Sequence, residues 1–285
     1  MRQRAIPTPP PLPVVLAAGA HPDDIEFMMA GTLLRLKAAG CQVHYWNVLN
    51  GSMGTGRYGA REAARVRTGE SRKAAALAGA TFHPPLFDDL DGYYEKGRLA
   101  RVASVVRRIQ PNLVLLQAPH DYMEDHQNVV RLLVTALFTR GMKNMAPRPN
   151  YAPSMVDCAL YHALPHGLCD ALGKRVRPEL YVDVSPFMAM KKEMLACHQS
   201  QASWLDASQG MRRYVETMAG FTREVGRMSK AFRHAEGWRK RSHLGFGPEA
   251  YDPLTRILGG AVKFDAIYAK EKKGGFPDFR DSSPS

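Results

Sequence analysis

The sequence predicts an α/β fold in which a Rossmann-like, mostly parallel sheet is flanked by helices. Two observations support this prediction. Short apolar runs of strand length recur along the first half of the chain, and most are followed by a segment with the apolar spacing of a helix. The 285 residues, of which 45% are hydrophobic and 23% charged, have the composition of a globular protein, which excludes a mostly disordered, collagen-like or coiled-coil chain.

The first predicted strand covers residues 14–18 (VVLAA), a short apolar run typical of a strand that is buried on both faces. A helix is expected to begin near Pro22, because proline fits the first helical turn and the two carboxylates that follow favour its positive end. A second strand is expected at 42–49 (QVHYWNVL). A helix follows over about 60–78, and Gly79 is typical of a helix C-terminus.

The same alternation continues along the chain. A helix over 99–109 ends before Pro111 and is followed by the apolar strand 113–116 (LVLL). A helix over about 125–140 comes after a polar loop. The pattern is then mixed, with strands near 156–160 and 180–184, a helix opened by Ser185-Pro186 and a long helix over about 208–229.

The chain is expected to form one domain with loosely packed ends. Residues 1–12 form a Pro-rich extended arm, residues 13–269 a single α/β domain, and residues 270–285 a flexible tail. Within the domain, 13–205 is the predicted core and 206–269 a helical, basic C-terminal elaboration. No apolar run reaches the ~18 residues of a membrane span. The four cysteines lack disulfide spacing, which is typical of a reducing compartment, so a cytoplasmic location is expected.

The net charge is +12, and half of it falls within residues 211–243, where nine Lys or Arg accompany three Glu. A segment of this kind can bind nucleic acid, or it can form a solvated basic face or the rim of a site for an anionic ligand. Charge alone does not specify nucleic acid. We therefore expect no nucleic-acid partner and favour the second interpretation.

Residues 21–24 (HPDD) directly follow the first predicted strand, where ligands of parallel sheets bind. His21 and Asp24 are spaced so that both can converge on one metal ion, while Asp23 points elsewhere and is free to act as a base. The alternative is a capping cluster, since carboxylates are favoured at helix N-termini. Asp125-His126 repeats the pattern after strand 113–116 and adds a second imidazole, which completes the open three-ligand set of a catalytic zinc.

Residues 54–59 (GTGRYG) match the G-x-G-x-x-G fingerprint of dinucleotide-binding proteins. The match follows the second predicted strand, its loop holds extra residues, and no acidic residue stands about 20 positions further on in a second strand. The segment is therefore interpreted as a flexible substrate loop. A nucleotide-binding Rossmann protein that uses residues 54–59 remains the alternative function of another class.

Four segments together resemble the PIG-L/LmbE deacetylases: AHPDD at 20–24, RTGE at 67–70, Asp125-His126 and KEMLACHQSQ at 192–201. The resemblance extends over about residues 14–201. It implies a Rossmann-like fold and a zinc-dependent hydrolase that removes an N-acyl group, usually acetyl, from an amino sugar or related glycoconjugate. The implied partner is therefore a small N-acylated sugar or conjugate, for which the basic segment would favour an anionic group.

The resemblance also implies roles for individual residues. His21, Asp24 and His126 are the expected ligands of one Zn²⁺ per chain, or of another divalent metal, and Asp23 is the expected general base. Arg67 matches a substrate-binding arginine, and Asp89, or alternatively Asp91, matches a substrate-binding carboxylate.

One departure from the family pattern concerns the oxyanion of amide hydrolysis. Many members carry an oxyanion-stabilising histidine three residues before the last metal ligand, where this chain has Met123. Asp125 is therefore expected to orient a different imidazole, or the metal and another donor hold the oxyanion. The candidates are His120, His162, His166 and His243, of which His162 is favoured as the catalytic group.

The metal centre does not select the amine that carries the acyl group. An amidase that acts on a thiol conjugate or another non-sugar amide is therefore the alternative within the same class of enzyme. The sequence is compatible with a homo-oligomer and names neither the substrate nor the pathway.

Overall fold

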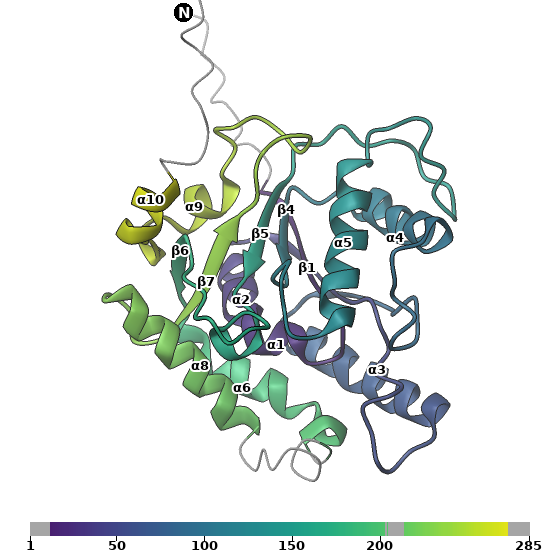
Figure 1. The fold of residues 1–285 in the computed structure, drawn as a ribbon, viewed down its shortest axis with the longest axis horizontal. Helices are drawn as coiled ribbons and strands as arrows, with labels where there is room; N and C mark the ends of the chain where they lie inside the picture. Colours follow the sequence, from purple (N-terminus) through teal and green to yellow (C-terminus); the bar gives the residue numbers. More distant parts are fainter. Residues whose placement is uncertain (1–11, 203, 205–213, 273–285) are drawn as a thin grey trace, which may run out of the picture.

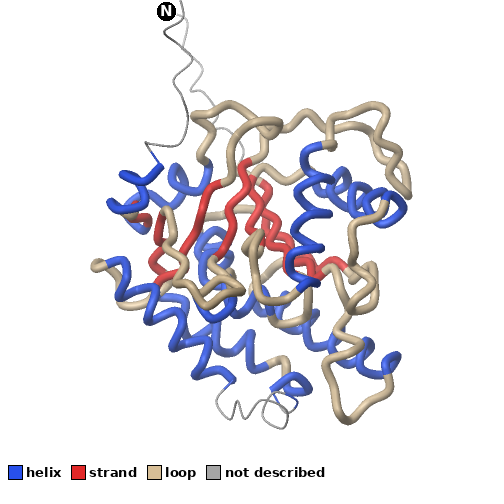
Figure 2. Tube along the Cα trace, viewed as in Figure 1, coloured by secondary structure: helices blue, strands red, loops and turns tan. Residues whose placement is uncertain are grey.

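The computed structural model describes residues 12–202, 204 and 214–272 of the chain. Its strands are β1 (Val14–Gly19), β2 (Gln42–Asn47), β3 (Thr81–His83), β4 (Leu113–Leu116), β5 (Ala159–Ala163), β6 (Leu180–Asp183), β7 (Ala235–Lys240) and β8 (Val262–Phe264). They form one eight-stranded sheet in the order β3-β2-β1-β4-β5-β7-β6-β8 (Figures 1 and 2). Strands β1 to β5 pair in parallel, and β7 is antiparallel to both of its neighbours. The predicted mostly parallel sheet is confirmed.

Helices cover both faces of this sheet (Figure 1). One face packs against α4 (Lys96–Ile109) and α5 (Glu124–Phe138). The other packs against α1 (Asp24–Met28), α2 (Ala30–Ala38), α6 (Met188–Ala196), α8 (Tyr214–Ser229) and α9 (Pro253–Leu258). Two further helices among the described residues are α3 (Ala60–Leu77), which packs against α6, and α10 (Ala266–Lys272).

The alternation of side chains along β1 shows why its sequence is apolar throughout. Val15 and Ala17 belong to the core on the α2 side, whereas Leu16 and Ala18 belong to the core on the α5 side. All four are buried. A central parallel strand therefore needs apolar residues at consecutive positions, since successive side chains point to opposite faces and both faces are covered.

Three details differ from the elements expected from sequence. The helix after residues 21–24 is broken at Met29 (φ −134°) into α1 and α2. The strand expected near 156–160 begins at Ala159 instead. The segment after residue 206 contributes two strands, β7 and β8, as well as helices. The start of the helix expected over 208–229, the N-terminal arm and most of the tail lie outside the described residues.

Strand β7 was not anticipated because its sequence, AEGWRK, places a glutamate in the core. The Glu236 carboxylate is buried and accepts a hydrogen bond from Lys191 Nζ at 2.5 Å. It also accepts the backbone N–H groups of Gly31 and Thr32 at 2.8 and 2.7 Å. These donors compensate the buried charge and tie β7 to the first turn of α2.

Within the described parts of the chain, no helix is long and apolar enough to cross a membrane. Cys41, Cys158, Cys169 and Cys197 are all free thiols, as their spacing predicts.

Candidate metal centre

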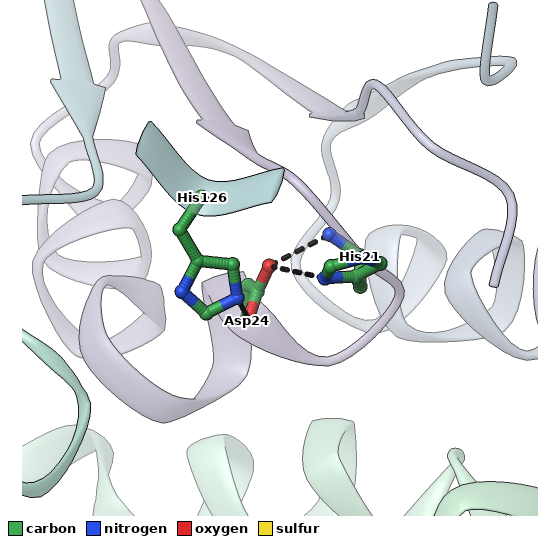
Figure 3. Close-up of side chains that lie close together, drawn as sticks. All are labelled: His21, Asp24 and His126. Carbon is green, nitrogen blue, oxygen red and sulfur yellow. Dashed lines mark hydrogen bonds and ion pairs between the residues drawn. The ribbon is translucent and has the colours of Figure 1, made fainter. Parts of the chain in front are cut away.

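The side chains that could hold a metal ion come from the carboxyl ends of two neighbouring parallel strands. β1 ends at Gly19, and the chain turns through residues 20–23 into α1; β4 ends at Leu116 and leads to the first turn of α5. Because β1 and β4 are paired, these two junctions lie together. His21, Asp24 and His126 offer ligand atoms that all lie within 4.8 Å of one another (Figure 3).

Both imidazoles are oriented by a carboxylate on the far side of the ring. His21 Nε2 lies 3.0 Å from an Asp125 oxygen, and His126 Nδ1 lies 2.9 Å from an Asp121 oxygen. The opposite nitrogens face Asp24, with 3.7 Å from His21 Nδ1 and 3.3 Å from His126 Nε2 (Figure 3). Metal-ligating histidines usually donate their second nitrogen to a carboxylate in this way. The donor set fits a divalent metal such as zinc.

The charges around the cluster favour a cation at its centre. Although burial opposes it, the carboxylates of Asp24 and Asp121 raise the pKa of His126 to about 10. The imidazoles of His126 and His21 in turn outweigh burial and hold the pKa of Asp24 well below its usual range. Together with Asp125, these carboxylates create a field that stabilises positive charge, which is the electrostatic requirement for binding a divalent metal.

Asp23 lies beside the cluster without joining it. Its backbone is left-handed (φ 108°), a conformation that non-glycine residues adopt at a cost of about 1–3 kcal/mol and that is concentrated at functional sites. The buried carboxylate accepts a hydrogen bond from the Tyr214 hydroxyl and lies 3.9 Å from Arg67 Nη2. Burial, opposed by Arg67, raises the pKa of Asp23 to about 6. The residue therefore combines a strained backbone with a carboxyl group that can exchange protons.

Arg67 is buried and is held by backbone carbonyls on both sides of the site. Its Nη2 donates to Pro22 at 2.8 Å, and its Nη1 donates to Gly51 at 3.3 Å. A Cβ at Gly51, whose φ is +78°, would lie 2.6 Å from Arg67 Cδ, and a Cβ at Gly54 would lie 2.7 Å from Nη1. The glycines of this loop therefore make room for the guanidinium. Of the glycines in residues 54–59, Gly54 therefore packs against Arg67, whereas a Cβ at Gly56 would meet Trp204.

Asp89 also holds the glycine-containing loop that follows β2. Its two carboxylate oxygens accept the backbone N–H groups of Gly51 at 2.7 Å and Met53 at 2.9 Å. One of them also lies 3.9 Å from His21 Nε2. Asp91, the alternative candidate, pairs with Arg98 instead and does not line the cavity. The geometry therefore places Asp89, rather than Asp91, beside the candidate metal centre.

The structure separates His162 from the candidate metal centre. Its Nδ1 donates to the Gln117 carbonyl at 2.8 Å, and its ring lines a different cavity. Asp125, expected to orient it, bonds His21 and the Leu90 N–H instead. The reason is the shifted strand: β5 extends to Ala163, so His162 is still paired with Leu116 rather than lying in the loop beyond the sheet.

His166, another of the candidate histidines, lies in that loop at the start of the short 3₁₀ helix η1 (His166–Leu168) and lines the metal-centre cavity. Its backbone N–H donates at 3.3 Å to Asp121, whose other oxygen orients His126. The imidazole packs against the rings of Phe27 and Phe221, with centroids 5.0 and 5.3 Å away. One carboxylate thus fixes both a candidate metal ligand and the loop that carries this histidine.

These residues surround one cavity of about 270 Å³. Several residues that sequence reasoning did not assign to the site also belong to it. Tyr122, four residues before His126, lines the cavity, as do Gln201 and Trp204 from a distant segment. Tyr214 of α8 contacts Asp23. The RTGE and KEMLACHQSQ segments do meet. The buried Glu70 carboxylate accepts both the backbone N–H of Ser200 at 2.9 Å and its hydroxyl at 2.6 Å.

A family model and a curated relative that match this chain are both described as deacetylases. Residues 16–137 match the PIG-L family model, described as GlcNAc-PI de-N-acetylase. The diacetylchitobiose deacetylase of Thermococcus kodakarensis is 29% identical over 233 residues, which cover 79% of this chain and 82% of that protein.

Solved structures share the fold. The N,N'-diacetylchitobiose deacetylase of Pyrococcus horikoshii has a TM-score of 0.69 at 21% identity and covers 85% of this chain and 88% of its own. GalB, the 4-carboxy-2-hydroxymuconate hydratase of Pseudomonas putida, has a TM-score of 0.66 at 20% identity and covers 85% and 99%. Since a hydratase and a deacetylase share this architecture, the fold alone does not select the reaction.

Proposed function

We propose that this chain, whose residues 16–137 match the PIG-L deacetylase family, is a metal-dependent hydrolase that removes an N-acetyl group from an amino sugar or glycoconjugate. The observation that carries the proposal is the juxtaposition of the His21, Asp24 and His126 cluster with a separate buried carboxylate, Asp23, in one cavity. A cluster of ligands alone would suit a structural metal, whereas the adjacent carboxylate supplies a proton acceptor.

Zn²⁺ is the metal that the donor set fits best, and His21, Asp24 and His126 would hold it. When bound, such a metal supplies Lewis-acid catalysis, which activates a water molecule and polarises an acyl oxygen. Asp125 and Asp121 hold the two imidazoles in the tautomers that leave the ligating nitrogens free.

In this proposal Asp23 accepts a proton from the attacking water and delivers it to the leaving amine. Tyr214 and Arg67 hold its carboxylate in place through the contacts described above. General acid–base catalysis of this kind contributes about 10²–10⁴ in rate.

Hydrolysis of an amide also builds negative charge on the acyl oxygen, and Met123 has no polar hydrogen to donate to it. We assign the donor to His166, because its imidazole lines the cavity with the metal ligands and its backbone is fixed by Asp121. This replaces the expectation that His162 has the role. Arg67 and Asp89 remain the proposed substrate-binding residues, Asp89 through the loop that it holds.

The substrate is proposed to be a small N-acetylated sugar or its conjugate. The Thermococcus relative is a deacetylase named for diacetylchitobiose, an acetylated amino sugar, which favours this class over a thiol conjugate. A single catalytic domain over 13–269 and a cytoplasmic location complete the proposal.

The test is a screen of the zinc-loaded protein against N-acetylglucosamine, diacetylchitobiose and an N-acetylated thiol conjugate, with released acetate as the readout. We expect acetate from at least one sugar, and release at least about a hundredfold slower from the Asp23→Asn variant. Protein that carries stoichiometric zinc and releases no acetate from any of these compounds would contradict the proposal.

A further inference from the structure

A second cavity of about 330 Å³ lies next to the metal centre. The ends of β5 and β7 and the residues that follow β4 and β5 contribute to its wall. Pro165 lines this cavity, while the next residue, His166, lines the metal-centre cavity. The two cavities are therefore lined by consecutive residues of one short loop.

The wall of the second cavity carries an excess of positive charge. Arg239, Lys240 and Arg241 line it, and Asp170 is the one carboxylate among the described lining residues. An Asp170 oxygen is already engaged by the backbone N–H groups of Leu172 and Lys174 at 3.0 and 2.9 Å. Lys240 Nζ lies 3.9 Å from Asp252. Neither arginine forms an ion pair with a carboxylate anywhere in the part of the chain that the structure describes.

His162 explains how one of these guanidinium groups is held. Its Nδ1 must carry the hydrogen, because its partner, the Gln117 carbonyl, only accepts. Nε2 then carries a lone pair that can accept a hydrogen bond, and it lies 3.4 Å from Arg241 Nη1. Burial also lowers the pKa of His162 to about 4, so the ring stays neutral near pH 7. The histidine therefore positions Arg241 without neutralising it.

Arg239 is held in a similar way. It is the cross-strand neighbour of His162, so both side chains leave the sheet on the same face. Its Nε donates to the Arg177 carbonyl at 2.7 Å, and its guanidinium lies 5.2 Å from the ring centroid of Tyr268. Both guanidinium groups are thus fixed by neutral partners and keep their full charge, which is the state that binds carboxylate or phosphate oxygens best.

We propose that this second cavity binds an anionic group, a carboxylate or a phosphate, carried by the same substrate whose acetamide reaches the metal centre. The inference rests on the proposed deacetylase function and narrows it to anionic amino-sugar conjugates. His162 acts in it as a positioning residue for Arg241.

The first experiment compares kcat/KM of the zinc-loaded protein for N-acetylglucosamine, its 6-phosphate and N-acetylmuramic acid, which distinguish a phosphate from a carboxylate. We expect at least about a tenfold preference for one anionic sugar over the neutral one, the size of one charged hydrogen bond. Arg241→Gln and Arg239→Gln should each reduce this ratio by about tenfold. Arg233→Gln, the same change at an exposed residue of the same basic segment, should leave it unchanged.

The second experiment measures binding of inorganic phosphate by calorimetry. Because phosphate also binds metals, the readout is the difference between Arg241→Gln and Arg233→Gln, and a tenfold weaker affinity is expected for the former. Equal kcat/KM for neutral and anionic sugars in the wild type, or a preference that survives both Arg239→Gln and Arg241→Gln, would overturn the inference. A different result would identify a failure of the proposed deacetylase function: no sugar would release acetate, while phosphate binding would still depend on Arg241. In that case the anion site would stand, and only its link to a shared substrate would be disproved.

Discussion

Replacing Asp23 with asparagine separates the base from the metal ligands. The asparagine keeps the shape of the side chain, and its amide oxygen can still accept the hydrogen bond from the Tyr214 hydroxyl. Asparagine also tolerates the left-handed backbone (φ 108°) better than most residues do. The variant should therefore fold normally, and its melting temperature should be equal to or higher than that of the wild type, because a buried carboxylate is removed.

The expected loss is confined to the chemical step. An amide cannot accept the proton of the attacking water, so kcat should fall by about 10²–10⁴, which corresponds to about 3–5 kcal/mol of barrier height. The ligand atoms of His21, Asp24 and His126 converge without Asp23, so zinc content should stay stoichiometric. KM should change little, since the cavity keeps its shape.

The assay pairs acetate-release kinetics with metal analysis on the same protein. Asp157→Asn, the same substitution at an exposed position, serves as the control and should match the wild type in both measurements. If Asp23→Asn loses zinc, or if its kcat stays within a few-fold of the wild type, the role assigned to Asp23 is wrong.

Four further predictions concern other parts of the site. Changing each of the three cluster residues to alanine should abolish both zinc binding and activity, and stoichiometric zinc in any two of these variants would disprove the cluster. His166→Ala should lower kcat by about 10²–10³ with zinc retained, as expected for a lost oxyanion donor, whereas His243→Ala should not; equal activity of the two would remove His166 from the mechanism. The pKa of His162 is about 4 in the folded protein and about 6.5 in an unfolded chain, so the unfolded state takes up this proton at a higher pH and the free energy of unfolding should fall as pH drops from 6.5 to 4. His162→Gln should reduce this pH dependence of the melting temperature. An unchanged pH dependence would argue against a buried neutral ring. Gly51→Ala should lower the free energy of unfolding by more than about 1 kcal/mol, because the alanine would have to adopt φ +78° and its Cβ would lie 2.6 Å from Arg67 Cδ. An unchanged denaturation midpoint would show that the loop can relax.

The sheet and the metal cluster were predictable because both depend on short stretches of sequence. Strand β1 is apolar at consecutive positions, and the predicted ligands His21 and Asp24 follow it within a few residues. His126 could be added because it occupies the same kind of junction after β4. In a parallel sheet these junctions meet at one edge, so local patterns were sufficient to bring distant residues together.

The rest depended on long-range packing that no local pattern reveals. Tyr214 reaches Asp23 only because α8 crosses the sheet face near α1. His162 was misplaced because β5 begins three residues later than its apolar pattern suggested, which moves a histidine from a loop into the sheet. β7 was missed because the charge of Glu236 is typical of a surface, and the buried Lys191 that compensates it lies 45 residues away.

The hydrogen bonds between Glu236 and the first turn of α2 also limit where this chain can be truncated. β7 pairs with β5 on one side and β6 on the other, so a protein truncated near residue 206 would expose the backbone of both strands as open edges, which promote aggregation. It would also leave the Lys191 ammonium buried without its partner and the N–H groups of Gly31 and Thr32 without an acceptor. Fusion tags should therefore be placed outside the span from β1 to β8, and a shortened protein should retain that whole span.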